Sequence, residues 1–229
     1  AARHAGGVQP DQLAGDLAAA MVRGFQQLQD LRLHGVVACV KHFAGYGLAE
    51  GGRDYNRVSV STVDLHNIHL PPFRAAIDAG CRTLMTTFSE VNGVPGSANE
   101  YLLRDVLREA WRFDGFVVSD WSSIVEMIAH GFSSDAADAA RQAVSAGVDM
   151  EMVSRTYHDH LASLVEQGAV SEGALDDAVR RILRDKFRLG LFDNPFVDGE
   201  AAVALVGSPQ FRAAGALAHP PRLQLQEHE

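Results

Sequence analysis

Short runs of apolar residues alternate with longer amphipathic segments along most of this chain. Four such runs cover residues 35–40, 82–88, 115–119 and 147–152. Short, mainly apolar runs of this length are typical of strands whose two faces are both covered, as in a parallel sheet. Their separations of roughly 30 to 45 residues fit strand–helix–strand crossovers. The pattern therefore predicts an α/β fold with about four parallel strands and flanking helices.

Apolar residues three or four positions apart predict the helices between these runs. We expect helices over residues 11–30, 99–111, 134–146 and 172–189, the last ending at Gly190. Ser61 or Thr62 can cap a further helix, which Pro71 and Pro72 interrupt before Gly80. The expected core-facing residues of the first, second and last helices are Leu13, Leu17, Met21, Phe25 and Leu28; Leu102, Leu103, Val106 and Leu107; and Leu175, Val179, Ile182, Leu183 and Phe187.

The four strand–helix units resemble half of an eight-stranded β/α barrel. Half a barrel leaves an unpaired strand at each edge of its sheet, and such edges are prone to pair with other chains. The chain also begins with Ala1 rather than Met. We therefore expect a partial TIM-like (β/α)8 barrel that belongs to a longer protein.

The composition argues against several classes of protein. Apolar residues make up 47% of the 229 residues and charged residues 21%, which is ordinary for a globular protein. The net charge is −9 and no block of Lys or Arg occurs, so neither nucleic acid nor a membrane surface is the expected partner. No apolar run approaches the ~20 residues that a membrane-spanning helix needs.

The cysteines and motifs predict no metal site and no cofactor. Cys39 and Cys81 lie in or beside apolar runs, so we expect two buried thiols rather than a disulfide. The sequence contains no CxxC motif and no Cys/His cluster. It also lacks a phosphate-binding loop and a dinucleotide-binding fingerprint, which argues against a metal or nucleotide enzyme.

The run over residues 115–119 ends abruptly in Asp120 and Trp121. The carboxyl end of a barrel strand is where catalytic residues usually lie. An acid fixed there beside an aromatic residue suits a nucleophile or base that acts on a sugar. An Asp at a strand-to-helix junction is equally typical of a helix cap. From the residues alone, both interpretations carry equal weight.

The other predicted strands also carry polar residues at or near their ends. These residues are Lys41 and His42, Ser89 and Glu90, and Asp149 and Glu151. In a β/α barrel such ends face one mouth. Lys41 could instead be a solvated tip and His42 a hydrogen-bonded core residue. Asp149 and Glu151 suit partners of neighbouring loops better than catalysts.

An ordered set of motifs from about Leu17 to Asp198 resembles glycoside hydrolase family 3, and its β-glucosidase branch in particular. The motifs are KHFAGYG at 41–47, EGGRDYN at 50–56, MTTFSEVNGVP at 85–95, LRDVLR at 103–108, FDGFVVSDW at 113–121, AGVDMEM at 146–152 and LRDKFRLGLF at 183–192. Each motif is modest alone, whereas the ordered set is specific. Family members often carry Tyr and Asn where this chain has Phe88 and Ser89.

The resemblance implies hydrolysis of terminal β-D-glucosyl residues by a retaining mechanism without a cofactor. Asp120 would be the nucleophile that forms a covalent glycosyl-enzyme, and nearby cations would help to keep its carboxylate ionised. The substrate would be a β-glucoside or an oligosaccharide. The implied substrate-binding residues are Lys41, His42 and Arg53, which would bind hydroxyl groups, and Met85 and Trp121, which would line the glucose pocket.

The resemblance also implies a domain organisation. Residues 1–199 would form the C-terminal part of the family's barrel domain, and residues 200–229 a linker-like tail that could be disordered. The other half of the barrel and a C-terminal sandwich domain, which supplies the acid/base Glu in this branch, would be the missing partners. We therefore expect the isolated chain to have little or no activity. The resemblance suggests a periplasmic or secreted protein, and a cytoplasmic one is an open alternative.

Three alternatives fit parts of the sequence. The β-N-acetylglucosaminidase branch of the same family takes its acid/base from an Asp-x-His pair, and Asp64 and His66 have that spacing. They lie about two dozen residues past His42, however, rather than on the loop directly after the first strand. A β-xylosidase of the family and a non-catalytic sugar-binding fragment are the other two alternatives.

Near the expected mouth the sequence contains four glutamates, Glu50, Glu90, Glu126 and Glu151, and its pattern identifies none of them as the catalytic acid.

Overall fold

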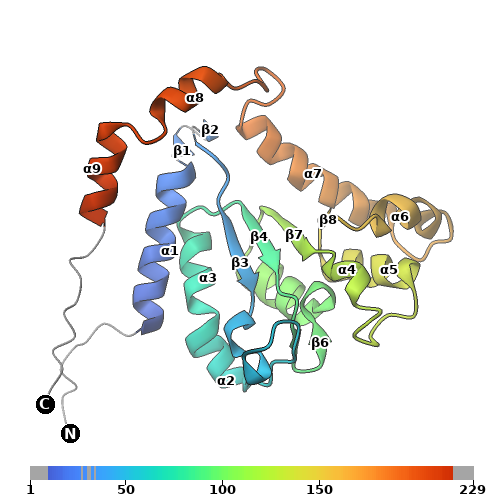
Figure 1. Ribbon diagram of the computed structural model, residues 1–229. Coiled ribbons are helices and arrows are strands. Elements are labelled where there is room, and N and C mark those ends of the chain that lie inside the picture. Colours follow the sequence, from blue (N-terminus) through green and yellow to red (C-terminus); the bar gives the residue numbers. More distant parts are fainter. Residues whose placement is uncertain (1–9, 27, 30–31, 34, 219–229) are drawn as a thin grey trace, which may run out of the picture. The chain divides into compact units, whose positions relative to one another are not determined.

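The computed structural model describes residues 10–26, 28–29, 32–33 and 35–218. The chain divides into two units, Ala1–Gly190 and Leu191–Glu229. A parallel sheet with the strand order β3-β4-β7-β8 lies at the centre of the first unit (Figure 1). Its strands are β3 (Cys39–Phe43), β4 (Thr83–Thr86), β7 (Phe116–Trp121) and β8 (Met150–Met152). This sheet confirms the predicted α/β fold.

The outer strands begin later than their apolar runs suggested. Residues 35–36 donate their backbone N–H groups to carbonyls in the last turn of α1 (Pro10–Gln26). Gly147 ends α5 (Ala136–Ala146) in the left-handed region, at φ 110°, so β8 starts only at Met150. In both cases the apolar run includes residues that complete the preceding helix.

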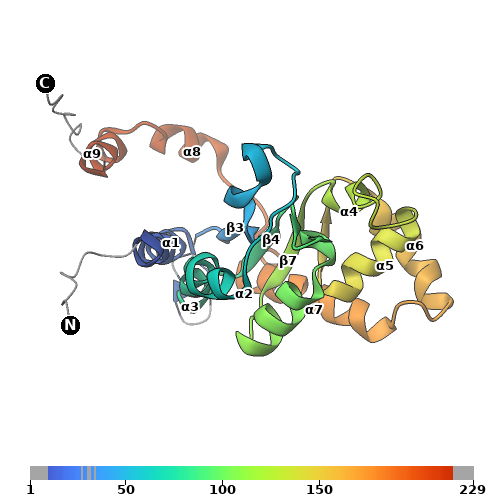
Figure 2. The same ribbon diagram turned by 90° about the horizontal axis from the view of Figure 1, so that it is seen from below.

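Helices join the strands, with α1 and α3 (Pro71–Asp78) beside β3 and with α5, α6 (Thr156–Glu166) and α7 (Glu172–Arg188) toward the β8 side (Figures 1 and 2). Ser61 caps α2 (Thr62–Asp64) by accepting a hydrogen bond from the backbone N–H of Asp64. The other helical elements are η3 (Leu65–His69), η5 (Tyr101–Ala110) and α4 (Ser123–Glu126). Short elements complete the unit: the 3-10 turns Tyr46–Leu48, Glu50–Gly52 and Gly96–Ala98, and the two-residue strands β1 (Leu28–Gln29), β2 (Arg32–Leu33), β5 (Glu90–Val91) and β6 (Val94–Pro95).

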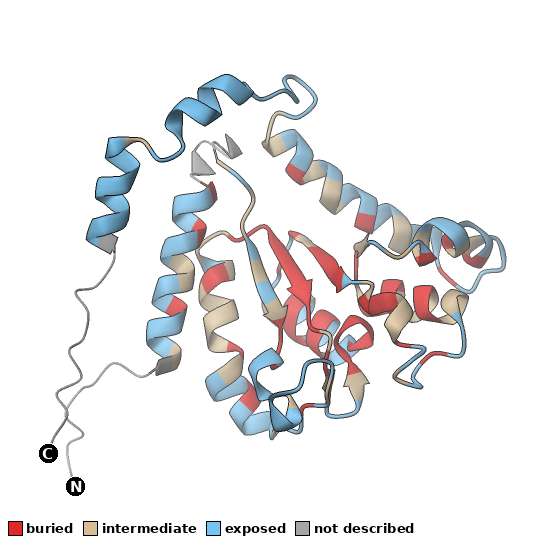
Figure 3. Ribbon diagram, in the orientation of Figure 1, coloured by how far each residue is buried: buried red, intermediate tan, exposed pale blue. Residues whose placement is uncertain are grey.

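The main core lies between the sheet and the helices η5 and α5. The four residues expected to face the core from η5, namely Leu102, Leu103, Val106 and Leu107, are all buried there. They pack with Leu84 of β4. Figure 3 shows the same burial as red colour along β4 and β7. The apolar periodicity of this helix therefore predicted its packing correctly.

The expected core face of α1 is exposed and that of α7 is covered only in part, by Leu175, which packs on a second core cluster, and by Ile182, which is half-buried, so the first prediction was wrong and the second held only in part. On α1, Leu13, Leu17, Met21 and Phe25 are exposed, whereas Val22 and Gln26 are buried. On α7, Val179, Leu183 and Phe187 are exposed as well. Leu28 lies in the short strand β1 rather than in α1. Periodicity located the apolar face of each helix, but the described residues leave most of it uncovered.

The two cysteines also differ. Cys81 is buried as expected, whereas Cys39 is exposed, because β3 is an edge strand of the sheet. Both thiols are free. Among the described residues, no helix has the length and apolar character required to cross a membrane.

The second unit contains α8 (Gly199–Leu205) and α9 (Pro209–Ala218). Asp198 caps α8 by accepting hydrogen bonds from the N–H groups of Glu200 and Ala201. Residues 199–205 and 209–217 are exposed. The linker-like tail over 200–229 stays a prediction, and its part beyond residue 218 lies outside the described residues.

Candidate active site

The carboxyl ends of the parallel strands β3, β4 and β7 lie at one edge of the sheet. His42 and Phe43 end β3, Thr86 ends β4, and Asp120 and Trp121 end β7. The strand pairings place β4 between the other two. Because the strands are parallel, the segments that follow them meet at the same face, as the sequence predicted.

Asp120 presents a carboxylate with one free oxygen at this face. The residue is 7% exposed, and its Oδ1 accepts a hydrogen bond of 2.7 Å from the backbone N–H of Trp121. Oδ2 has no hydrogen-bond partner among the described residues, but it lies 3.2 Å from Nε2 of His42. Asp120 does not cap α4, whose N-cap is Ser122. The capping interpretation of Asp120 is therefore wrong.

His42 is held between Asp120 and the loop after β3. Its ring lies 4.5 Å from the ring of Tyr46, measured between centroids. The hydroxyl of Tyr46 donates a hydrogen bond of 3.0 Å to Oδ2 of Asp54. Partial burial lowers the pKa of His42 below 6.5, and Lys41 acts in the same direction, against the charges of Asp120 and Asp54. A neutral His42 can donate one ring N–H toward Asp120.

The other expected substrate-binding residues have no described contact with the Asp120 carboxylate like that of His42. Lys41 is exposed and is near enough to His42 to influence its pKa. Trp121 is 62% exposed beside Asp120, and Met85 is buried on β4. Arg53 is exposed on the loop after β3, and the described contacts do not join it to Asp120. The structure therefore brings together His42, Asp120 and Trp121 most directly.

Buried hydroxyl groups support the strands beneath this face. Ser97 lies 2.8 Å from the hydroxyl of Thr86 and 2.8 Å from that of Ser123, measured between Oγ atoms. The Ser119 hydroxyl donates to the Asp120 carbonyl and accepts from the backbone N–H of Met152. These bonds tie β4, β7 and β8 together just below Asp120, which favours a fixed position for its carboxylate.

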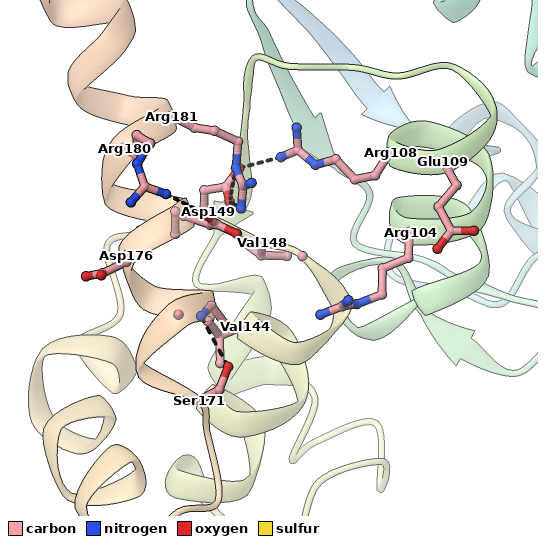
Figure 4. Close-up of a pocket in the computed structure, with 15 residues that line it drawn as sticks. Arg104, Arg108, Glu109, Val144, Val148, Asp149, Ser171, Asp176, Arg180 and Arg181 are labelled. Carbon is pink, nitrogen blue, oxygen red and sulfur yellow. Dashed lines mark hydrogen bonds and ion pairs between the residues drawn. The ribbon is translucent and has the colours of Figure 1, made fainter.

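Asp149 lies at the opposite end of the sheet from Asp120. Its carboxylate accepts hydrogen bonds from Arg108, from Arg181 and from the backbone N–H of Val117. Figure 4 shows this cluster in a cavity of about 570 Å³ between η5 and α7. Burial lowers the pKa of Arg108 to about 10. Asp149 therefore ties the start of β8 to two helices, and does not face the mouth.

Glu151 binds the loop after β8 through hydrogen bonds, as expected. Its carboxylate accepts hydrogen bonds from Ser154, Thr156 and the backbone N–H of Tyr157. The Asp64 and His66 side chains, the acid/base pair of the N-acetylglucosaminidase alternative, also contact other residues rather than Asp120. Asp64 accepts from the Ser61 hydroxyl, and His66 lies 2.6 Å from the hydroxyl of Tyr101.

Sequence reasoning missed the link from Tyr46 and Asp54 to His42. Both residues stand in the glycine-rich segment after β3, but their contact depends on how that segment folds back. No periodicity or spacing signals such a contact. Among the residues that the structure describes, no group of three or more His, Cys, Asp or Glu side chains could hold a metal ion.

Comparison with known proteins identifies the family. Residues 8–184 match the model of the glycosyl hydrolase family 3 N-terminal domain. The chain belongs to glycosyl hydrolase family 3. The match falls in the family's N-terminal domain as a whole, so the narrower placement in the C-terminal half of that domain stays a prediction.

Among curated relatives, this family 3 chain is 42% identical to a periplasmic β-glucosidase of Salmonella typhimurium over 77% of its own length. It is 37% identical to a lysosomal β-glucosidase of Dictyostelium discoideum over 89% of its length, and 37% identical to a putative β-xylosidase of Formosa agariphila over 71%. The chain spans only 23%, 26% and 22% of these three relatives.

Solved structures agree with the same family. The β-glucosidase of Listeria innocua is 40% identical to this chain and superposes with a TM-score of 0.84 over 89% of the chain and 29% of that enzyme. Structures of that β-glucosidase contain glucose, isofagomine, gluconolactone and, in a mutant, laminaribiose. The four-stranded sheet with its helices thus matches part of the barrel domain of family 3.

Proposed function

We propose that this chain carries the nucleophile side of a retaining, exo-acting β-glucosidase site, with Asp120 as the nucleophile. The observation that carries the proposal is the free Oδ2 of Asp120, which is buried, accepts no hydrogen bond among the described residues and lies 3.2 Å from Nε2 of His42. A carboxylate nucleophile needs one oxygen free to attack the anomeric carbon. The matched β-glucosidases support glucoside as the substrate class.

The reaction would proceed in two displacements. Oδ2 of Asp120 attacks the anomeric carbon while the bond to the leaving-group oxygen breaks and that oxygen takes a proton. Water then attacks the anomeric carbon and passes a proton to the same acid/base group, while the bond to Oδ2 of Asp120 breaks and β-glucose leaves with its configuration retained. Lys41, His42 and Arg53 would bind sugar hydroxyls through contacts that strengthen as positive charge develops on the ring.

The proposed glucose pocket is only partly provided by this chain. Met85 and Trp121 would line it at the ends of β4 and β7. A retaining site needs a second carboxyl group about 5 Å from the first. No contact among the described residues joins such a group to Asp120. We propose that regions of the relatives outside the matched quarter, the other barrel half and a sandwich domain, supply the acid/base Glu and the remaining glucose contacts.

A mechanism-based fluoroglucoside, which traps the glycosyl-enzyme, tests the proposal directly. The enzyme would be reconstituted by grafting this chain into the corresponding region of a family 3 relative, and the labelled peptide mapped. The label should appear on Asp120. Label on any other carboxylate would overturn the assignment of the nucleophile, and binding without label would favour a sugar-binding role.

A β-xylosidase is the second candidate, because xylosidases of the family match this chain at 36–37% identity. A xylosidase acts on a sugar that lacks the hydroxymethyl group of glucose. Hydrolysis of aryl glucoside and aryl xyloside by the same reconstituted enzyme separates the two. We expect the higher kcat/KM for the glucoside.

A further inference from the structure

The cavity of about 570 Å³ between η5 and α7 lies at the end of the sheet opposite Asp120 (Figure 4). Its size falls within the range of roughly 300 to 1,000 Å³ that is usual for small-molecule sites. The proposed glucosidase reaction does not use it. We call it the arginine cavity, because four arginines line it: Arg104, Arg108, Arg180 and Arg181.

Two helices bring these arginines together. Arg104 and Arg108 lie four residues apart on η5, and Arg180 and Arg181 are neighbours on α7. Figure 4 shows Arg104 and Arg108 extending from η5 toward α7, and Arg181 extending from α7 toward η5. Guanidinium groups from both sides of the cavity therefore converge.

Positive charge exceeds negative charge at the point of convergence. Asp149 is 6% exposed there, and its carboxylate accepts hydrogen bonds from both Arg108 and Arg181. One buried carboxylate thus faces two guanidinium groups. Burial lowers the pKa of Arg108 to about 10, and the charge of Arg181 acts in the same direction. A second anion would offset the repulsion between these cations.

The other acids of the cavity wall do not supply that second anion. Asp177 accepts a hydrogen bond from Arg180. Asp176 and Glu109 are exposed, and within the described ranges neither forms an ion pair with the four arginines. Figure 4 shows Asp176 pointing away from the arginine side chains. The excess of positive charge therefore remains at the centre of the cavity.

Several N–H groups of the arginines are free to bind a ligand. Arg104 donates from Nε to the carbonyl of Ser145, and its two terminal nitrogens have no hydrogen-bond partner among the described residues. Arg181 uses Nε and Nη2 for Asp149, which leaves its Nη1 without a partner in the same part of the chain. Free guanidinium N–H groups bind oxyanions through short, charge-assisted hydrogen bonds.

The first turn of α7 adds backbone donors at the same cavity. Ser171, Gly173 and Ala174 line it, and Ser171 caps the helix by accepting a hydrogen bond from the N–H of Ala174. A Cβ atom at Gly173 would meet no atom within 4 Å, so the backbone there is open to a ligand. The first N–H groups of a helix have no partner within the helix, and they carry partial positive charge.

We propose that the arginine cavity binds a phosphate group, held by the free N–H groups of Arg104 and Arg181 and by the first turn of α7. The planar guanidinium group matches phosphate because it can donate two parallel hydrogen bonds. The bound group would link η5 to α7 beside Asp149, which ties β8 to the same two helices. This site is separate from the proposed glucoside site, so either can be present without the other.

NMR titrations of this 229-residue chain test the proposal at constant ionic strength. Inorganic phosphate and methyl phosphate serve as probes of the free ion and of a phosphate monoester. With either probe, the backbone amide signals of Gly173 and Ala174 should shift and reach saturation. The probe that binds more tightly identifies the source of the phosphate group. R104Q should weaken binding by about tenfold, because one charge-assisted contact is lost. R104K keeps the charge and should lose less.

Arg112 provides the matched control, because it is an exposed arginine just beyond η5 that does not line the cavity. R112Q should bind both probes as wild type does. Phosphate should also raise the Tm of wild type and of R112Q by more than that of R104Q. The general effect of phosphate on protein hydration is the same for all three proteins, so it cancels in this comparison.

Three results would overturn the proposal. The first is a set of shifts that grow without saturation for both probes. The second is equal affinity of wild type and R104Q. The third is equal weakening by R104Q and R112Q, which would show a response to overall charge only. None of these results bears on the role of Asp120, which the fluoroglucoside label tests separately.

Discussion

At the scale of single residues, the site depends on the contact between His42 and Asp120. The two residues are 78 positions apart in the sequence, and they meet because β3 and β7 both end at one face of the sheet. Asp120 is held by the backbone N–H of Trp121 on one oxygen and faces His42 with the other. His42 in turn packs on Tyr46, which Asp54 orients. Asp120 is therefore positioned by the end of β7, and His42 by the loop after β3.

The pKa of His42 should report this contact. Burial lowers the pKa, and the negative charge of Asp120 raises it. Removing that charge in D120N should therefore lower the pKa of His42 further below 6.5. NMR titration of the imidazole signals measures the shift. D176N, which removes an exposed charge on α7, serves as the control and should leave the pKa unchanged. A pKa that rises in D120N would contradict the contact.

The same substitution tests catalysis in the reconstituted enzyme. An amide is a poor nucleophile and cannot balance positive charge at the anomeric carbon. D120N should therefore lower kcat on an aryl β-glucoside by on the order of a thousandfold or more, as expected for loss of a nucleophile. D176N should retain full activity. Near-normal turnover by D120N would reject Asp120 as the nucleophile.

At this scale the sequence predicted residue types better than their contacts. Asp120 was recognisable because an apolar strand ends in it, and the strand then fixes its position. The orientation of Tyr46 by Asp54 was not predictable, because it arises from the fold of a loop. Burial raises the pKa of Glu126, and the charges of Asp120 and Asp54, far from it in the sequence, add to the shift, so the sequence pattern did not predict it.

At the scale of elements, buried charges fasten α7 to the sheet. Asp185 on α7 is 2% exposed, and its Oδ1 lies 2.9 Å from Nε of Arg82, just before β4. Arg82 is also buried and pairs with Asp114, before β7. Arg188 reaches the same oxygen of Asp185 at 3.3 Å. The segments that lead into β4 and β7 therefore share one ionic cluster with α7.

Removing Asp185 should destabilise the chain strongly. D185A leaves Arg82 buried with one partner fewer, and breaking a buried pair in this way typically costs about 3–5 kcal/mol. Chemical denaturation should show a free energy of unfolding lower by about that amount. D176A removes an exposed carboxylate from the same helix and should change stability by less than about 0.5 kcal/mol. Equal stability of the two variants would show that the cluster contributes little.

The helices show that apolar periodicity does not predict which faces are covered. Periodicity identified η5 and its buried face correctly, because the sheet of this chain covers that face. It identified the apolar faces of α1 and α7 equally well, yet Leu17, Met21 and Leu183 are exposed. A pattern reveals that a face is apolar but not which segment will cover it. The start of β3 was predicted too early, because the backbone N–H groups of residues 35–36 donate hydrogen bonds to the last turn of α1 instead of joining the sheet.

At the scale of the whole molecule, the exposed faces lie at the two edges of the sheet. Beside the edge strand β3, an apolar hollow of about 440 Å³ is lined by residues that include Met21, Phe25 and Val36. At the β8 side, α7 exposes its own apolar face. These surfaces agree with the expectation of a partial barrel, and the chain spans about a quarter of its relatives.

The activity of the chain by itself depends on the carboxyl groups that its own residues bring to Asp120. Asp120 and His42 are in place, but no described contact brings Asp120 the second carboxyl group that a retaining mechanism requires. The isolated chain should therefore hydrolyse an aryl β-glucoside only weakly or not at all, while the enzyme reconstituted with the missing parts of a relative turns it over. Steady-state assays of both at equal concentration compare them, and D120N in each provides the background. Turnover by the isolated chain that matched the reconstituted enzyme and vanished in D120N would show that its own residues supply the proton donor, and Glu126, with its raised pKa, would then be the first residue to test.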